Sequence, residues 1–395
     1  DLISQYETAK EDAKVEDKLE LANYYLDQIN KLKKEKVIQN LSKYNVIPKY
    51  GFPVDVVDLQ IWNDGKIDQK YDLSRDLSIA ISEYAPESEV IVDKGKYTSR
   101  YISLPKTGQF TKFYYFTCPN CERDNINQIS NKLIKCEYCG VDYDEQVNDY
   151  FIEPIYGFKT GINKESSTKK PKKTYAGSTS YLGDGRPDEK KLVIGTNNYI
   201  TIETTSDDEL LVMNKNPFFM CDKCGYSEII KNKKGMLSYP KSHLNFKGKQ
   251  CNCDTLHPIS LGHKFKTDVA KLTIIGLNNK AKALSLLYAF LEGISQEFNI
   301  ERKDIDGIVV KNMNNEYDLI VYDNVPGGAG HVKRIMDEKM LVETFKLALM
   351  KVEQNCCDED SSCYNCLRNY NNQSYHKLLK RKLAIEAIKE IFNNI

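Results

Sequence analysis

The chain has 395 residues, enough for roughly two or three domains, and its 41% hydrophobic content excludes a disordered chain without a core. Its 56 basic and 56 acidic residues cancel, which excludes a generally basic nucleic-acid-binding surface, so any such contact must come from local patches. No segment approaches the roughly 18 apolar residues of a membrane span. The N-terminus lacks signal-peptide features. We therefore expect a cytoplasmic protein.

The first part of the chain predicts a helix followed by a mixed region. Residues 1–43 are charged, contain neither Gly nor Pro, and place apolar residues near helical spacing. Because residue 1 is not Met, we expect natural sequence upstream of it. In the mixed region, 44–115, we predict a strand at 54–61, a helix at 74–84 with Ser74 as its N-cap, and strands at 89–93 and 97–103.

The rest of the chain divides by its cysteines. A zinc ribbon is expected at 116–149, a β-rich region at 150–215 and a second ribbon-like module at 216–260. The last part, 261–395, has an α/β pattern. It predicts strands at 269–275, 305–310 and 317–322, and helices at 280–298, 331–350 and 374–392. The fold class is thus mixed α/β or α+β, a β-rich region with two zinc-ribbon-like modules and a C-terminal α/β zinc-binding domain.

Twelve cysteines fall into three groups of four, and this pattern favours metal over disulfides. In the first group, two Cys-x-x-Cys pairs are separated by fourteen residues, which is zinc-ribbon spacing. Gly140 follows the last cysteine and suits a turn that needs positive φ. The predicted ligands of this site are Cys118, Cys121, Cys136 and Cys139.

The second and third groups are less regular. The second pairs a Cys-x-x-Cys with a Cys-x-Cys, and His257 could replace one of its thiolates; its predicted ligands are Cys221, Cys224, Cys251 and Cys253. The third contains adjacent cysteines, and His376 or His331 could replace one member; its predicted ligands are Cys356, Cys357, Cys363 and Cys366. Closed, thiolate-rich sites contribute folding energy and leave no position for activated water. We therefore predict three structural Zn²⁺ ions.

Catalytic motifs are hard to find in this sequence. It has no phosphate loop of the type G-x-x-x-x-G-K-[ST], no G-x-S-x-G elbow and no H-E-x-x-H. His331 and Lys333 begin like a phosphodiesterase motif, but Glu338 stands where that motif has Asp. A nuclease is therefore a minor alternative.

Two segments suggest contact with nucleic acid, although each also has a purely structural explanation. The Gly-rich turn after Asp323 could form a backbone nest for a phosphate, or could be a tight strand-to-helix turn. The segment after Cys366 mixes aromatic, amide and cationic residues that suit base and phosphate contact, or could be a solvated basic helix. The candidate contact residues are Gly327, Gly328, Gly330, His331, Arg368, Tyr370, Gln373, His376, Lys380 and Arg381.

Several motifs resemble a known family. The stretch from Tyr322 to His331 and the segment from Ser362 to Gln373 resemble the MrfA-type zinc-binding domain, which closes a group of bacterial superfamily-two helicases. This group includes the DrmB subunit of the DISARM phage-defence system. The segments 45–57 and 75–86 are similar to the region that follows the motor in these proteins. The resemblance covers roughly residues 40–395.

The resemblance implies ATP-dependent translocation on DNA, a defence or repair role, and zinc ligation by the last four cysteines. Because the chain has no ATPase motif, we expect an accessory module that binds DNA or docks to a separate or upstream motor, with residues 1–43 as a docking element. The alternatives are a zinc-stabilised scaffold without DNA contact and the nuclease.

Overall fold

The computed structural model describes most of the chain beyond residue 54. The described residues are 2–15, 22, 25–26, 29 and 55–395, with gaps at 64–65, 69, 129–131, 147–148, 162–164, 167–170, 172–176, 184–186, 189–190, 234–235, 239–241, 254–255 and 326. Helix α1 covers Leu2–Val15. It agrees with the start of the predicted N-terminal helix, most of whose remainder lies outside the described residues.

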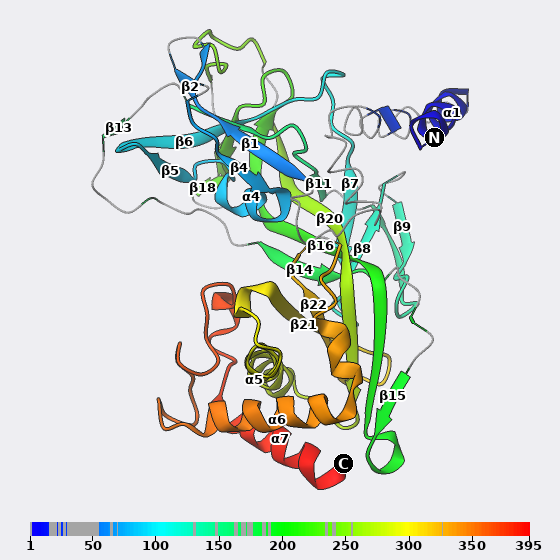
Figure 1. The fold of residues 1–395 in the computed structure, drawn as a ribbon. Helices are drawn as coiled ribbons and strands as arrows, with labels where there is room; N and C mark the ends of the chain where they lie inside the picture. The colour runs from blue at the N-terminus through cyan, green and yellow to red at the C-terminus, as the bar shows by residue number, and fades with distance from the viewer. Residues whose placement is uncertain are drawn as a thin grey trace.

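A six-stranded sheet forms the N-terminal part of the described fold (Figure 1). Its order is β13-β6-β12-β1-β4, with β5 paired to β6; β1 and β12 run parallel, and the other pairs are antiparallel. Helix α4 (Leu77–Glu83) packs its buried side chains against this sheet and the next. The strands are β1 (Val56–Gln60), β4 (Ser74–Asp76), β5 (Glu89–Val92), β6 (Gly95–Ile102), β12 (Phe158–Thr160) and β13 (Glu165–Ser166).

The second sheet is built on two very long antiparallel strands, β16 (Ile200–Cys221) and β20 (Leu256–Ile274). Their register runs from Ile200 opposite Ile274 to Cys221 opposite Leu256, with two irregularities that bend the pair. Figure 1 shows this pair running from the six-stranded sheet to the C-terminal helices. The remaining strands are β7 (Phe113–Thr117), β8 (Asp124–Asn127), β11 (Tyr150–Ile152), β14 (Ser178–Tyr181), β15 (Lys191–Ile194), β17 (Ser227–Ile229), β21 (Ile305–Lys311) and β22 (Tyr317–Asp323).

Three small hairpins complete the β structure. Trp62 lies in the first of these hairpins, and the second carries half of the first cysteine group. The pairs are β2 (Trp62–Asn63) with β3 (Lys66–Ile67), β9 (Lys132–Lys135) with β10 (Asp142–Gln146), and β18 (Lys231–Lys233) with β19 (Met236–Ser238).

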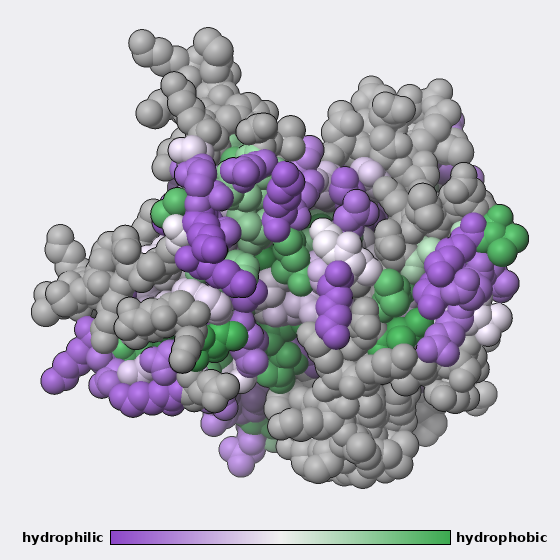
Figure 2. Space-filling model, turned by 90° about the horizontal axis from the view of Figure 1, so that it is seen from above, coloured by the Kyte–Doolittle hydropathy of each residue, from purple (hydrophilic) through white to green (hydrophobic). Residues whose placement is uncertain are grey.

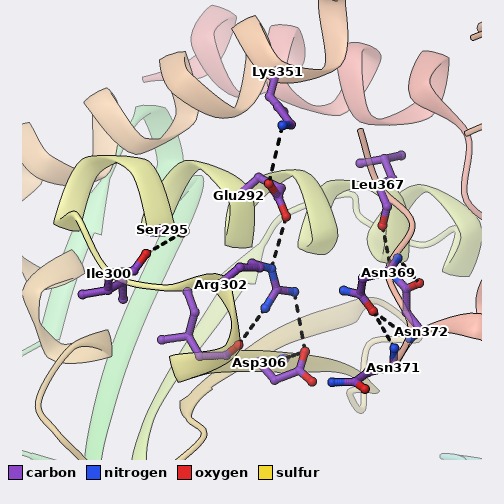
Figure 3. Close-up of polar contacts among 12 residues, drawn as sticks. Glu292, Ser295, Ile300, Arg302, Asp306, Lys351, Leu367, Asn369, Asn371 and Asn372 are labelled. Atoms are coloured by element: carbon purple, nitrogen blue, oxygen red, sulfur yellow. Dashed lines mark hydrogen bonds and ion pairs between the residues drawn. The ribbon is translucent and has the colours of Figure 1, made fainter. Parts of the chain in front are cut away.

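Three helices cover one end of the long sheet and enclose the largest core (Figure 1). They are α5 (Lys280–Phe298), α6 (Glu338–Glu353) and α7 (Arg381–Asn394). Helix α5 is buried on nearly all sides, and at Gly293 it approaches α6 so closely that a Cβ would lie 2.3 Å from the Thr344 carbonyl oxygen. Arg302, in the loop after α5, forms an ion pair with Glu292 of α5. Glu292 in turn faces Lys351 of α6 (Figure 3).

The structure confirms the predicted class and most predicted elements, with corrections at helix starts. Ser74 is not the N-cap of α4; it lies in β4, and the Asp76 side chain accepts the capping bond from the Ser78 amide. The helix predicted at 331–350 begins as a 3₁₀ turn at 332–336, and α6 starts after Asp337. The helix predicted at 374–392 starts only at Arg381.

On one face of the molecule, the described residues are mainly polar (Figure 2). Seen from above, hydrophilic residues predominate, with smaller apolar patches between them (Figure 2). Within the described part of the chain, no helix has the length and hydropathy that crossing a bilayer demands.

Candidate metal centres

The first centre joins the tips of two hairpins. Cys118 and Cys121 lie between β7 and β8, and Cys136 and Cys139 lie between β9 and β10. The four sulfur atoms converge, with 3.6 Å between Cys118 and Cys139 and 3.6 Å between Cys121 and Cys136. The sequence prediction placed this set of four together, and the structure does the same.

Three of the cysteine turns share one backbone pattern. In the turns that begin at Cys118, Cys136 and Cys221, the first cysteine carbonyl accepts the amide four residues on, and the first cysteine amide donates to the carbonyl five residues on. The fourth residue after the first cysteine has positive φ, and it is Glu122, Gly140 or Gly225. This confirms the conformation expected for Gly140. Such turns point both thiolates of a Cys-x-x-Cys pair at one position.

Side chains around the first centre anchor it to the rest of the fold. Asn125 donates to the Cys136 sulfur (3.4 Å) and accepts the Glu137 amide (2.8 Å), so it orients the second turn. Two further contacts reach α5 and β21: Lys280 pairs with Glu122, and Lys311 donates to the Asn120 carbonyl at 3.3 Å. The first centre therefore contacts the C-terminal part of the chain.

The second centre contains a histidine that the sequence analysis did not select. Cys221, Cys224 and Cys251 lie together as predicted, and the ligand atom of His243 lies with theirs, all within 4.8 Å of one another. Cys253 contacts Cys221 but does not belong to that converging set. His257 faces Asp222 at 3.3 Å with an exposed side chain, away from the cluster.

The third centre brings the adjacent cysteines together with the later pair. The sulfur of Cys357 lies 4.0 Å from that of Cys356 and 3.8 Å from that of Cys366, and Cys363 lies 3.8 Å from Cys366. Neither of the alternative histidines joins this group. The ring of His376 is bonded instead to Asn369 and Asn372.

The sulfur spacing fits zinc. A tetrahedron with Zn–S bonds of about 2.3 Å has edges of about 3.8 Å, and neighbouring sulfurs in the three centres lie 3.6 to 4.0 Å apart. All twelve cysteines are free thiols rather than disulfides. The chain therefore has three cysteine-rich zinc-binding centres, as predicted. When bound, zinc would cross-link the segments that meet at each centre.

Protonation of the thiols opposes metal binding at several buried positions. Burial raises the pKa of Cys121 and of Cys366 to about 12 and that of Cys224 to about 11. Cys139 differs, because the Asn120 side chain bonds to it and lowers its pKa to about 6. Zinc must therefore displace protons from the buried thiols, which makes metal binding depend on pH.

A buried arginine links the end of α6 to the third centre. Arg381 is 1% exposed; its Nε donates to the Val352 carbonyl at the end of α6 (2.8 Å), and its Nη1 donates to the Cys357 carbonyl. Arg381 was predicted to contact nucleic acid, and its burial corrects this prediction. The guanidinium satisfies backbone carbonyls that would otherwise be unpaired.

The Gly-rich turn is filled by a carboxylate of the protein itself. Asp323 is fully buried and accepts the amides of Ala329 (2.7 Å), His331 (3.0 Å) and Val332 (3.0 Å). Burial raises the pKa of this carboxyl group, although the three amides act in the opposite direction. The Gly330 amide is bonded to Asp268. The backbone nest thus holds an internal anion, which corrects its interpretation as a free phosphate site.

Other contacts at this turn are also internal. The Gly327 amide donates to the Lys266 carbonyl, and a Cβ at Gly328 would lie 2.2 Å from the Asp268 carboxylate. Lys333 pairs with Asp268 at 2.8 Å and donates to Ser206 at 2.6 Å. Lys333, the cation that a phosphodiesterase motif would use, is therefore already paired.

The segment after Cys366 is partly internal and partly exposed. Arg368 donates to Ser362 and to the His376 carbonyl. Asn369 and Asn372 close the loop on itself, and the Asn372 amide group reaches the Leu367 carbonyl (Figure 3). The exposed candidates are Tyr370, Gln373 and the side chain of Lys380.

Comparisons with known proteins include a family match at the third centre and a relative that aligns with most of the chain. The sequence model of the MrfA Zn-binding domain matches residues 286–367. This range includes all four cysteines of the third centre. The chain is 22% identical over 410 residues to the Druantia protein DruE of Escherichia coli (strain UMEA 4076-1). That alignment covers 91% of the chain but only 22% of DruE, so the chain spans a small part of this relative's length.

Solved structures give weak similarity over most of the chain. A crystal structure of the DUF1998 helicase MrfA bound to DNA has a TM-score of 0.39 at 9% identity, covering 85% of this chain and 34% of that one. The structure of MrfA alone has a TM-score of 0.33 at 10% identity, again covering 85% and 34%.

Proposed function

We propose that this chain is the accessory, zinc-stabilised part of a helicase or translocase system that acts on DNA in phage defence. The observation that carries the proposal is the relation to the Druantia protein DruE over 91% of the chain, together with the MrfA-type zinc-binding domain at 286–367. The narrower prediction of a DISARM subunit is not taken further, because the curated relative belongs to Druantia.

The zinc ions act as structural cross-links in this proposal. Each centre has four protein ligands and no open position, so none would activate water or a substrate. The ATPase activity would belong to a motor in the same polypeptide or in a partner chain. Residues 1–43 are proposed as the segment that docks to that motor, and the genomic sequence upstream of residue 1 distinguishes the two arrangements. A phosphate-loop motif in the same reading frame would place the motor in cis.

Contact with DNA is assigned to the exposed loop of the third centre. Two tyrosines stand at its surface, with exposed fractions of 64% for Tyr364 and 62% for Tyr370. Gln373 and Lys377 are exposed between them and α7. Aromatic rings stack on bases of a single strand, and cations bind phosphates, so this combination suits single-stranded DNA. The asparagine network closes the loop on itself, and zinc at the third centre would anchor its start.

Fluorescence anisotropy with a short labelled single strand tests the assignment. We expect binding whose affinity falls as salt rises between about 50 and 200 mM, because bound phosphates release counterions. Lys377→Ala should make the salt dependence shallower by about one unit of slope, and Tyr370→Ala should weaken binding by about 1–3 kcal/mol. Lys339→Ala is the matched control, since Lys339 is also exposed and lies at the N-terminal end of α6, whereas the third centre follows the C-terminal end of that helix.

The rival functions predict different outcomes. A scaffold without DNA contact would give no binding even at low salt. A nuclease would cleave DNA with a divalent metal and lose that cleavage in His331→Ala. We expect binding at low salt because of the exposed tyrosines and cation of the loop, and no cleavage because Lys333 is already paired with Asp268.

A further inference from the structure

The second metal centre offers more ligands than a tetrahedral ion can use. Cys221 and Cys224 come from the turn after β16, and Cys251 and Cys253 follow a short hairpin. His243 begins that hairpin. Since Zn²⁺ in structural sites takes four ligands, one of these five side chains must lie outside the coordination sphere.

The position of the His243 ring points to metal ligation. The side chain is 6% exposed, and among the described residues its Nε2 has no hydrogen-bond partner. A buried polar atom without a partner carries a desolvation cost of about 1–3 kcal/mol. The ligand atom of this ring converges with the sulfurs of Cys221, Cys224 and Cys251. A metal ion at that point would bind this buried ring.

Neighbouring groups hold the ring in this orientation. The ring stacks on Tyr226, with 4.7 Å between ring centroids and 19° between planes. The backbone carbonyl of His243 accepts the Cys251 amide at 3.0 Å, which places two of the converging residues at opposite ends of one hairpin. Cys253, by contrast, contacts Cys221 without joining the converging set.

We infer that the second centre is a zinc site of three cysteines and one histidine, formed by Cys221, Cys224, His243 and Cys251, with Cys253 outside the coordination sphere. The inference concerns the ligands of this site and does not depend on DNA binding. Tyr226 acts as a positioning residue, because it contacts the His243 ring and not the metal.

This ligand set gives the ion a defined structural task. Phe246 lies in the hairpin between His243 and Cys251, and its ring centroid is 5.1 Å from that of Trp62 and lies 4.5 Å from the Lys159 amine. The Tyr101 hydroxyl donates to the Leu244 carbonyl at 3.0 Å. Ligation of His243 therefore clamps the hairpin onto the six-stranded sheet and the β2–β3 hairpin.

The zinc content of full-length variants tests the ligand set. Cys253→Ser should retain three zinc ions per chain, whereas the double variant His243→Ala with Cys253→Ser should retain two. After replacement of zinc by cobalt, Cys253→Ser should leave the sulfur-to-cobalt charge-transfer absorbance per chain unchanged, and His243→Cys should increase it. Loss of one zinc in Cys253→Ser, or His243→Ala with three metal ions and an unchanged cobalt spectrum, would overturn the inference.

Trp62 provides an independent readout, because it is the single tryptophan of the chain. In the double variant, the freed hairpin should move Phe246 away and shift the Trp62 emission to longer wavelength, while circular dichroism shows that the chain stays folded. Cys253→Ser should keep the wild-type emission. An emission shift in Cys253→Ser that matches the shift of the double variant would contradict the assignment of His243.

Discussion

Replacing Arg381 by alanine distinguishes a structural arginine from a DNA-binding one. The side chain is buried and bonds the carbonyls of Val352 and Cys357. Each carbonyl left unpaired costs about 1–3 kcal/mol, and the lost stem adds a cavity, so Arg381→Ala should lower the free energy of unfolding by about 3–5 kcal/mol. This is a large share of the roughly 5–15 kcal/mol that stabilises a domain.

The assay combines urea unfolding, zinc content and DNA affinity. Because the Cys357 carbonyl loses its partner, the third centre should release zinc to a chelator faster in Arg381→Ala. For urea unfolding and zinc content, the neighbouring Lys380→Ala is the matched control, since Lys380 has a 42% exposed side chain at 4.0 Å from Asp360 and its ion pair contributes at most about 1 kcal/mol. If Arg381→Ala had wild-type stability and zinc retention but a shallower salt dependence of DNA binding, the guanidinium would face DNA and our reasoning would be wrong.

Four further variants probe two glycine turns and two carboxylates. Asp323→Ala leaves three amides unpaired and should cost about 3 kcal/mol in urea unfolding; a loss below about 0.5 kcal/mol would contradict the filled nest. Gly225→Ala should cost one zinc ion per chain, because a Cβ there would lie 1.9 Å from the Ile102 carbonyl oxygen, whereas Gly140→Ala, with similar φ and nothing within 4 Å, should keep all three. Burial raises the pKa of Asp306. The neutral Asp306 carboxyl group therefore contributes fully to stability below its pKa in the unfolded chain, about 4, and this contribution is lost as pH rises through the raised pKa of the folded chain. Asp306→Asn should thus gain stability relative to wild type as pH rises. The opposite trend in urea unfolding would refute this.

Elements with a strong local signal were predictable from the sequence. The helix at 280–298 has the predicted bounds, because Asn279 caps it, Asn299 ends it with positive φ, and its apolar residues continue around the helix. The first cysteine group was also predictable, since two Cys-x-x-Cys turns contain their ligand geometry within a few residues. The strand predicted at 269–275 was only the end of β20, whose bends are not apparent in the local pattern.

Features that depend on distant contacts were not predictable. His243 stands eight residues before Cys251, without a motif, and only the hairpin brings it to the second centre. Arg381 has the sequence environment of a solvated basic helix, yet it fills a site between α6 and the third centre. The glycines after β22 suggested a free nest, because the sequence does not show that the Asp323 carboxylate turns back into it.

Native mass spectrometry of the full chain purified without chelator tests the central claim most directly. Three intact cysteine-rich centres predict one species that carries three zinc ions, and acid denaturation should release all three and leave twelve free thiols. Two or fewer zinc ions, or a metal-free mass lowered by hydrogen loss from disulfides, would contradict the account.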